Sequence, residues 1–579
     1  MSQLDWIVLI VTLTAIISFG LVKSRTTKSL EGYFLSNRSM PWYLVLLSIM
    51  GTQASAITFL SAPGQAYTDG MRFVQYYFGL PLAMVVLCIT FVPRFNQLKV
   101  FTAYAFLEQR FGKPTRLFTS FLFLLSRGLS TGISIYAPSI IIASLLGWDI
   151  FWTNLVMGGL LIVYTVNGGA KAVAYTQKIQ LFIIFAGMLM AGCMIVHLLP
   201  EGIGFNEALK VTGATGKLNV ITTGFTPKGF DFKDKYNLIS GTIGGFFLAL
   251  SYFGTDQSQV GRYLTAKNNT ESKMGLLMNG LIKVPMQFCI LLIGALLFTF
   301  YSFQKAPIYF DLASKQKALQ TSYQSQLQEK EKQFVTVQQQ YQRYVQRFAS
   351  EELHTEKYKD SIGQANTQLQ TLRTEYKQLL QKALHQSDAN DTNYIFLRFV
   401  VDFLPKGLVG LLIAIIFMAA WGSIAAALNS LASCTMIDFH MHFRKAPSYP
   451  SNTTIEQSAK DYRLSKWYTF AWGIFCIITA EFATGMGSLI EAVNILGSLF
   501  YGVILGIFLV GFYMKAIQGR AILIAAIIGE IIVIGTFVAD KLGYIGIGFL
   551  WLNVVGTLSV VLLSFAVQLV LNTAKKVTA

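Results

Sequence analysis

Charged side chains are scarce in this chain of 579 residues, where they make up 13% of the sequence. That is about half the share usual in soluble domains. Hydrophobic residues reach 53%, and the mean hydropathy is +0.51. A soluble protein cannot hide so many apolar side chains, because too much of its surface stays exposed. The scarcity of charge therefore excludes a soluble globular protein and predicts a chain whose solvent is the lipid bilayer.

The chain also lacks the short alternating segments that a membrane β-barrel needs. Its apolar stretches are continuous, as in residues 288–300 and 501–514. Backbone groups in hydrocarbon must then pair within their own helix, which predicts an all-α membrane protein. Cysteines are few, lie in apolar segments and show no CxxC spacing: Cys88, Cys193, Cys289, Cys434 and Cys476. This pattern excludes a disulfide or metal framework and is typical of small buried side chains.

Acidic residues number only 29 against 46 Lys and Arg, which gives a net charge of +17. Most of the basic residues lie in short loops between apolar stretches, and they form no single patch. We therefore attribute the excess to basic cytoplasmic loops and expect no nucleic-acid partner. We expect no cleaved signal peptide either, because Asp5 precedes the first apolar stretch and the basic residues follow it.

Thirteen apolar segments of roughly 20 residues or more predict about 13 transmembrane helices. We place them near residues 4–22, 41–66, 73–93, 116–146, 150–168, 173–199, 238–258, 274–304, 396–436, 465–486, 487–513, 520–540 and 546–571. The basic loops then fall on one side, with the N-terminus outside and the C-terminus inside. We expect a multi-pass protein of the cell inner (plasma) membrane.

One segment, residues 304–392, interrupts this apolar pattern and is rich in Gln, Lys, Glu and Tyr. Its apolar residues recur at spacings of three to four, and the pattern falters near Ser350. That periodicity predicts an external helical hairpin of coiled-coil type. Two interpretations stay open: a solvated insertion without a role, and a binding site for a protein partner.

Small and polar residues interrupt several apolar segments. Residues 48–64 contain Gln53 and Pro63, residues 245–257 and 419–430 are rich in small and polar side chains, and Glu491 and Asn494 lie in the eleventh segment. Transporters place ion and solute sites near the middle of the bilayer on discontinuous helices, whose freed carbonyls bind cations. We therefore expect a functional break in the second segment.

These motifs resemble the sodium/solute symporter family. Residues 55–63 with Ala66 and Tyr67 are similar to the first core helix of sialic-acid members, and Asn429, Ser430 and Asp438 to the end of the eighth. Residues 168–173 resemble the GGxKAV signature and residues 256–267 the DQxxxxRYLxAK signature. The resemblance covers essentially the whole chain except the insertion.

The resemblance implies a LeuT-type inverted repeat of five plus five helices with extra helices. Residues 1–40 would hold the first helix and its loop, and residues 41–303 the first repeat and the start of the second. Residues 304–392 would be the insertion, residues 393–513 the remainder of the second repeat, and residues 514–579 the C-terminal peripheral helices.

The family's main sodium site, carried over to this chain, would use the backbone carbonyls of Gly51, Ala54 and Ala419 and the hydroxyl of Ser423. Gly422 stands where the family usually has another serine. Some members bind a second sodium with an Asp and two more serines. At those positions this chain has Gln177, Ala425 and Ala426, so the resemblance implies one sodium ion per solute.

For the solute, the resemblance implies contacts with Gln53, Ser55, Thr58, Tyr77, Tyr252 as a lid, and Asn494. Ser130 stands where sialic-acid members carry an Arg. Arg127 lies one turn earlier, where it either reaches the cavity or snorkels toward the cytoplasmic interface. We favour snorkelling.

The predicted function is sodium-coupled import of a small organic solute by alternating access. A sugar or sugar derivative is favoured, because neutral amide, hydroxyl and aromatic groups suit a polyol. The alternatives are an organic anion such as a sialate or a monocarboxylate, proton coupling through Glu491 or Glu530, and a solute sensor without transport. An enzyme is not expected, because no His, Asp and Glu residues cluster at catalytic spacing. The expected partners are the solute, sodium and the lipid bilayer.

Overall fold

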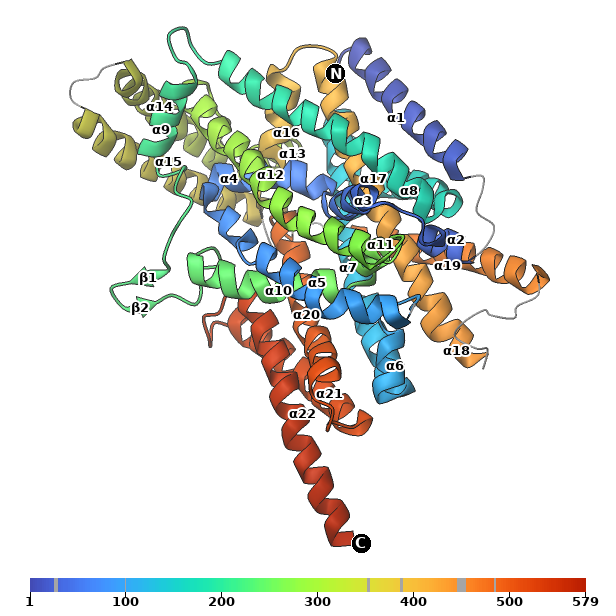
Figure 1. The fold of residues 1–579 in the computed structure, drawn as a ribbon. Coiled ribbons are helices and arrows are strands. Elements are labelled where there is room, and N and C mark those ends of the chain that lie inside the picture. Colours follow the sequence, from blue (N-terminus) through green and yellow to red (C-terminus); the bar gives the residue numbers. More distant parts are fainter. Residues whose placement is uncertain are drawn as a thin grey trace.

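The computed structural model describes residues 1–24, 30–98, 100–350, 355–385, 389–444, 455–483 and 486–578. These residues are almost entirely helical (Figure 1). The β-structure among them is a two-stranded antiparallel sheet in a connecting segment, formed by β1 (Phe225–Thr226) and β2 (Gly229–Phe230). The prediction that the chain is all-α is therefore confirmed for the described residues, apart from this small sheet.

The described residues of the first half of the chain form twelve α-helices. They are α1 (Gln3–Ser24), α2 (Leu30–Leu35), α3 (Trp42–Gln53), α4 (Ala56–Asp69), α5 (Leu80–Leu98), α6 (Ala105–Phe111), α7 (Lys113–Leu146), α8 (Ile150–His197), α9 (Phe205–Ala214), α10 (Gly245–Thr255), α11 (Gln257–Tyr263) and α12 (Asn269–Phe303). Shorter helical pieces join some of them: the 3-10 helices η1 (Ser36–Arg38) and η2 (Met71–Tyr77), and the π-helix η3 (Ser240–Gly244).

The second half holds the insertion and the last membrane segments. Its helices are α13 (Leu312–Ala318), α14 (Gln324–Ser350), α15 (Thr355–Leu384), α16 (Thr392–Phe403), α17 (Leu408–Cys434), the π-helix η4 (Thr435–His440), α18 (Met441–Phe443), α19 (Ile455–Glu481), α20 (Leu489–Tyr513), α21 (Gly519–Lys541) and α22 (Leu550–Thr578). In Figure 1, α22 extends away from the other helices to the C-terminus.

Each of the expected apolar segments contains helix. Among the described residues, eight helices are long and apolar enough to cross a membrane, or nine if the bent pair of α3 and α4 counts as one. Residues Gln3–Ile16 and Ile150–Val166 form shorter apolar helices. The chain is therefore an integral membrane protein by composition and length, while the count of 13 crossings stays a prediction.

Helix α8 contains two of the expected segments, 150–168 and 173–199. The hydroxyls of Tyr164 and Thr176 lie 2.9 Å apart. In a straight helix, residues twelve positions apart would be roughly 18 Å apart along the axis. The parts of α8 on either side of residues 167–172 therefore lie side by side. The side chains of those six residues, which carry most of the GGxKAV-like motif, lie outside the described part of the chain.

The insertion forms the expected helical hairpin, with α14 packed along α15 (Figure 1). The apolar stripe that predicted it becomes a separate core, which includes Leu327, Phe334, Tyr341 and Val345. This core also contains Val211 of α9, so the hairpin is packed onto the membrane part. We refer to α14 and α15 together as the hairpin.

Two breaks between consecutive helices of the described chain position the site described below. Helices α3 and α4 meet at an angle of 61°. Their break falls at Ala54 and Ser55, which confirms the expected interruption, while Pro63 lies inside α4. The second break separates α10 from α11 at Asp256, whose backbone is extended and whose carboxylate accepts the N–H of Ser258.

Candidate functional site

A cavity of about 110 Å³ lies between the two broken segments, and we refer to it as the central cavity. Side chains from α3, α4, α5, α7, α10, α12 and α20 and from the η2 segment line it. The structure brings together seven of the eight residues that the sequence assigned to the solute: Gln53, Ser55, Thr58, Tyr77, Arg127, Tyr252 and Asn494.

The break between α3 and α4 places polar groups in the central cavity. Helix α3 ends at Gln53, and Ser55 has an extended backbone before α4 begins at Ala56. The Oε1 atom of Gln53 is buried and has no hydrogen-bond partner within the described chain. Buried amide oxygens normally accept a hydrogen bond, so a bound ligand with a hydroxyl or N–H group would supply the donor that this oxygen lacks.

Tyrosines form much of the cavity wall. The hydroxyl of Tyr76 donates to Oδ1 of Asn494 at 3.0 Å, and the hydroxyl of Tyr252 accepts from Nε2 of Gln259 at 2.7 Å. The Tyr252 ring lies 5.9 Å from the ring of Tyr501, measured between centroids. Tyr252 is thus held at both its edge and its hydroxyl, in a position to cover a small bound solute.

Arg127 lines the central cavity and does not snorkel. Its side chain is buried, donates to Oγ of Ser258 at 2.6 Å, and lies 3.9 Å from the carboxylate of Asp256. The favoured interpretation is therefore wrong, because the break after α10 offers this arginine a counter-ion inside the protein. Ser130 does not line the cavity; its hydroxyl donates to the Arg127 carbonyl.

Sequence reasoning missed Lys283, which enters the central cavity from α12. The residue is 1% exposed, and its ammonium nitrogen lies 5.8 Å from the centroid of the Tyr77 ring. Within the described chain it has no hydrogen bond or ion pair. A lysine inside an apolar membrane segment is itself a signal for a functional site. That signal was present in the sequence, but only the packing shows that the side chain faces the cavity.

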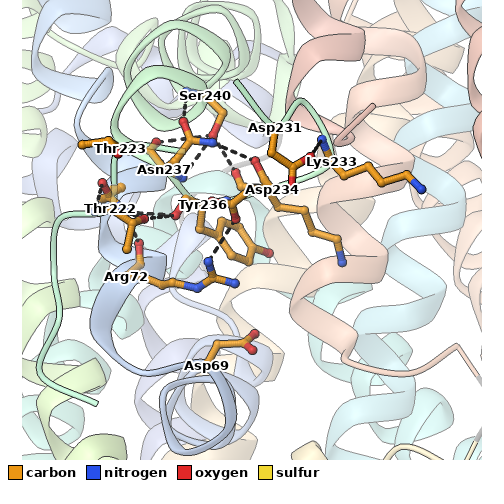
Figure 2. A network of polar contacts seen from close by, with 12 residues as sticks. Asp69, Arg72, Thr222, Thr223, Asp231, Lys233, Asp234, Tyr236, Asn237 and Ser240 are labelled. Carbon is orange, nitrogen blue, oxygen red and sulfur yellow. Dashed lines mark hydrogen bonds and ion pairs between the residues drawn. The ribbon is translucent and has the colours of Figure 1, made fainter. Parts of the chain in front are cut away.

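An aromatic layer separates the central cavity from a second pocket on the hairpin side. The rings of Tyr236 and Phe73 lie 4.8 Å apart, and those of Phe73 and Tyr76 lie 5.6 Å apart and are stacked. The second pocket has a volume of about 830 Å³ and is lined by charged side chains of both signs. In Figure 2, Arg72 reaches toward Asp234, with which it forms an ion pair of 3.0 Å.

Glu491 connects this second pocket to the wall of the central cavity. Its carboxylate accepts from Nζ of Lys235 and from the hydroxyl of Tyr236, both at 2.9 Å. Asn494 follows three residues later on the same face of α20. Glu491 is therefore paired outside the central cavity, and neither it nor Glu530 lines that cavity.

The residues assigned to sodium lie where the end of α3 packs against α17. The N–H of Ser55 donates to the carbonyl of Gln53, and the N–H of Thr58 donates to the carbonyl of Ser55. The carbonyls of Gly51 and Ala54 consequently lack their usual helical partners. Carbonyls released in this way at a broken helix are the groups that coordinate cations in transporters.

Helix α17, which packs against α3, carries the other residues assigned to sodium, Ala419, Gly422 and Ser423, and all three are buried. The Ser423 hydroxyl donates to the carbonyl of Ala420 at 3.0 Å, which leaves its oxygen lone pairs available. A Cβ atom on Gly422 would lie 2.7 Å from Oε1 of Gln180. The glycine therefore permits close packing between α17 and α8.

Gln177 of α8 lies between the two sides of this arrangement. Its Oε1 atom accepts from the hydroxyl of Ser48 at 3.0 Å, and its Nε2 atom lies 3.4 Å from Oγ1 of Thr52 and 3.1 Å from the carbonyl of Gly422. The amide thus bridges α3 and α17 by hydrogen bonds. Its oxygen already has a donor, which leaves it poorly suited to a second cation.

Comparison with known proteins agrees with this architecture. The model of the sodium:solute symporter family matches residues 33–325 and 376–529. The unmatched residues between these ranges belong to the hairpin. The sodium/sialic acid symporter SiaT of Proteus mirabilis (strain HI4320) is 25% identical over 565 residues, which is 96% of this chain and 93% of that protein.

The human sodium/iodide cotransporter is 30% identical over 279 residues, and the match spans 48% of this chain and 42% of that protein. Among solved structures, a Na+-coupled sialic acid symporter in a substrate-bound outward-open state superposes with a TM-score of 0.73 at 23% identity, covering 98% of both chains. The two proteins share their fold.

Proposed function

Because the chain belongs to the sodium:solute symporter family, whose members are transporters and not enzymes, we propose that it imports a small organic anion together with sodium. Lys283 is the observation that carries this proposal. The sequence favours a neutral sugar, because most of the residues that it assigns to the solute are uncharged. A buried ammonium in the cavity favours the alternative solute, an organic anion, over the sugar.

The charges around the central cavity do not cancel. Asp256 compensates Arg127, whereas Lys283 has no counter-ion in the described chain. A buried cation without a partner costs several kcal/mol, and a carboxylate bound beside it would offset that cost. Two of the similar proteins carry anions by name, iodide and sialic acid.

The size and polarity of the central cavity favour a hydroxy-carboxylate of few atoms. Its volume of about 110 Å³ lies below the roughly 300 Å³ at which pockets for drug-sized ligands begin. A carboxylate would bind Lys283, and a hydroxyl would donate to the unpaired oxygen of Gln53. Ser55, Thr58 and Asn494 would provide further hydrogen bonds.

We further propose the main sodium site at the carbonyls of Gly51, Ala54 and Ala419 with the Ser423 hydroxyl. An ion there would join α3 to α17 while the cavity is open on the hairpin side. Its release would loosen that contact and open the opposite side, which is the alternating access of the predicted transport cycle. One ion per solute follows from the bridging amide of Gln177 and from Ala425 and Ala426, which supply no side-chain oxygen.

The proposed arrangement in the membrane has about 13 crossings, the N-terminus and the hairpin outside, and the C-terminus in the cytoplasm. It rests on the basic residues of the loops assigned to the cytoplasm. The membrane would be the plasma membrane. Protease added to right-side-out vesicles should cut the hairpin first, whereas cleavage only in inverted vesicles would contradict this orientation.

The nature of the solute decides how transport responds to voltage. One sodium with a monocarboxylate moves no net charge, so a tenfold sodium gradient supports only about tenfold accumulation. One sodium with a neutral sugar moves one charge. The membrane potential then adds about 2.3 kcal/mol per 100 mV to the roughly 1.4 kcal/mol of the gradient, which together support roughly 500-fold accumulation.

Uptake into proteoliposomes tests the proposal. Radiolabelled lactate, acetate, sialate and glucose are compared with and without a sodium gradient, each at zero and at an imposed potential of about 100 mV. We expect sodium-dependent uptake of lactate that does not change with potential. Glucose uptake driven by the potential would contradict the proposal of an anionic solute and favour a sugar. A sugar is the second candidate, because neutral hydroxyl and amide groups also line the cavity.

A further inference from the structure

Arg262 in α11 is a buried cation that the proposed solute site does not use. The residue is 2% exposed, and its Nε and Nη1 atoms have no hydrogen-bond partner within the described chain. No carboxylate among the described residues lies within ion-pair distance of it. Burial of an arginine without a counter-ion is unusual, because this side chain carries five donors and a permanent charge.

The charged neighbour of Arg262 makes its position still less favourable. Arg127 is a second cation close enough to Arg262 to act on it electrostatically. Arg127 and Arg262 thus lie near each other, and Lys283 is on the adjoining helix α12; within the described chain, the carboxylate paired with one of these three cations is that of Asp256, 3.9 Å from Arg127. Like charges that share a buried region attract an anion to it.

Arg262 lies one helical turn beyond the wall of the central cavity. Ser258, whose hydroxyl binds Arg127, precedes it by four residues, so both lie on the same face of α11. Arg262 itself does not line the cavity. It is displaced toward the end of α11, where the Ser272 hydroxyl of α12 donates to the Tyr263 carbonyl.

Helix α12 carries another buried polar group between Lys283 and the start of this helix. Asn279 precedes Lys283 by four residues and hence shares its face of α12. It is fully buried, and both its amide oxygen and its amide nitrogen lack partners in the described chain. The hydroxyl of Tyr263 on α11 also lacks one. Unpaired polar groups thus continue beyond the cavity, toward the side where α11 ends and α12 begins.

We propose that Arg262 is a second anion site, which receives the carboxylate of the solute after it leaves Lys283 and before it reaches the cytoplasm. This inference rests on the proposed function, because it needs an anionic solute. The planar guanidinium binds a carboxylate through two parallel hydrogen bonds. Such a site would lower the barrier for release on the side opposite the hairpin.

Transport of lactate from the two faces tests this site. In right-side-out vesicles, Arg262→Gln should change the external lactate concentration for half-maximal uptake by less than twofold. In inverted vesicles, where lactate enters from the cytoplasmic face, the half-saturating concentration should rise about tenfold. Arg262→Lys should raise the half-saturating lactate concentration less, about threefold and only at that face, because lysine keeps the charge but cannot form the two parallel hydrogen bonds of a guanidinium. Arg398→Gln, at an arginine paired with Asp402 outside the cavity, is the matched control.

The outcomes separate this inference from the proposed function. If wild-type protein carries no carboxylate, both fail. If wild-type protein carries lactate and Arg262→Gln raises the half-saturating lactate concentration equally at both faces, Arg262 has a structural role only, and the proposal of a second anion site is wrong. Wild-type kinetics at both faces in Arg262→Gln would also overturn it. If Arg262→Gln does not fold, Arg262→Lys decides: an affinity loss confined to the cytoplasmic face supports the site, and equal effects or none at the two faces overturn it.

Discussion

The central cavity and the base of the hairpin differ in whether their buried polar groups have partners within the protein. At the base of the hairpin, which we define as Arg373, Lys377 and residues 391–393, polar side chains are paired within the protein. Around the central cavity, Oε1 of Gln53 and the ammonium of Lys283 have no hydrogen-bond partner in the described chain, and neither do Nε and Nη1 of Arg262, one turn beyond.

Asn393 shows how completely the hairpin base is paired. Its Oδ1 atom accepts from the Ser61 hydroxyl at 2.7 Å and from the Leu489 N–H at 3.3 Å, and its Nδ2 atom donates to the Gly487 carbonyl at 3.0 Å. This one side chain links the start of α16 to α4 and to the start of α20. Beside it, Lys377 forms an ion pair of 2.5 Å with Asp391.

The cation of Arg373 is likewise satisfied. Its Nη2 atom donates to the Pro307 carbonyl at 2.9 Å, and its guanidinium lies 5.1 Å from the Phe310 ring and 5.8 Å from the Tyr67 ring. Paired groups hold a framework in one arrangement, whereas unpaired buried groups are completed by a ligand. We therefore expect the hairpin base to stabilise the fold and the central cavity to bind the solute.

The largest effect should come from removing the unpaired cation of the central cavity. Lys283→Gln should lower lactate uptake at least 100-fold, or about 2.8 kcal/mol. Its thermal stability without solute should not fall, because an uncompensated buried charge is lost. Lys377→Gln, which removes the ion-pair partner of Asp391 at the hairpin base, is the control with the opposite pattern: reduced stability and unchanged half-saturation. Reduced stability in Lys283→Gln with normal uptake would contradict the assignment.

The next largest effect concerns the hairpin base itself. Asn393→Ala should lower the free energy of unfolding by about 2 kcal/mol, because the Gly487 carbonyl and the Leu489 N–H lose their partner. The affinity for lactate should change by less than twofold. Thermal unfolding in detergent and equilibrium binding measure the two quantities. A loss of affinity without a loss of stability would show that the hairpin base takes part in binding.

A tenfold effect is expected at the sodium site. Ser423→Ala should raise the sodium concentration for half-maximal uptake about tenfold, equivalent to about 1.4 kcal/mol. Ser430→Ala on the same helix removes a hydroxyl that donates to the Ala426 carbonyl, and it should leave sodium dependence unchanged. Equal sodium dependence in both variants and in the wild type would remove Ser423 from the site.

The smallest effect should appear at the lid. Tyr252→Phe removes only the hydroxyl that accepts from Gln259, so the half-saturating lactate concentration should rise about threefold, or roughly 0.7 kcal/mol. The ring that covers the cavity stays in place. Uptake assays over a range of lactate concentrations measure this shift. An effect as large as that of Lys283→Gln would mean that the hydroxyl contacts the solute directly.

Much of this arrangement follows from local sequence. Continuous apolar stretches predicted the helices, because backbone groups in hydrocarbon must pair within their own segment. The small and polar residues of segment 48–64 predicted the first break, which falls at Ala54 and Ser55. The three-to-four periodicity predicted the hairpin. Family motifs then directed attention to seven residues that meet in one cavity.

By itself, the sequence determined which segments enter the membrane, where a helix breaks and which small residues allow helices to approach. These properties depend on neighbours along the chain. Only the tertiary structure decided that Arg127 meets Asp256 and that Lys283 faces the cavity without a counter-ion. The physical reason is that the cost of a buried charge depends on groups more than a hundred residues away, whose distance is set by how the helices pack.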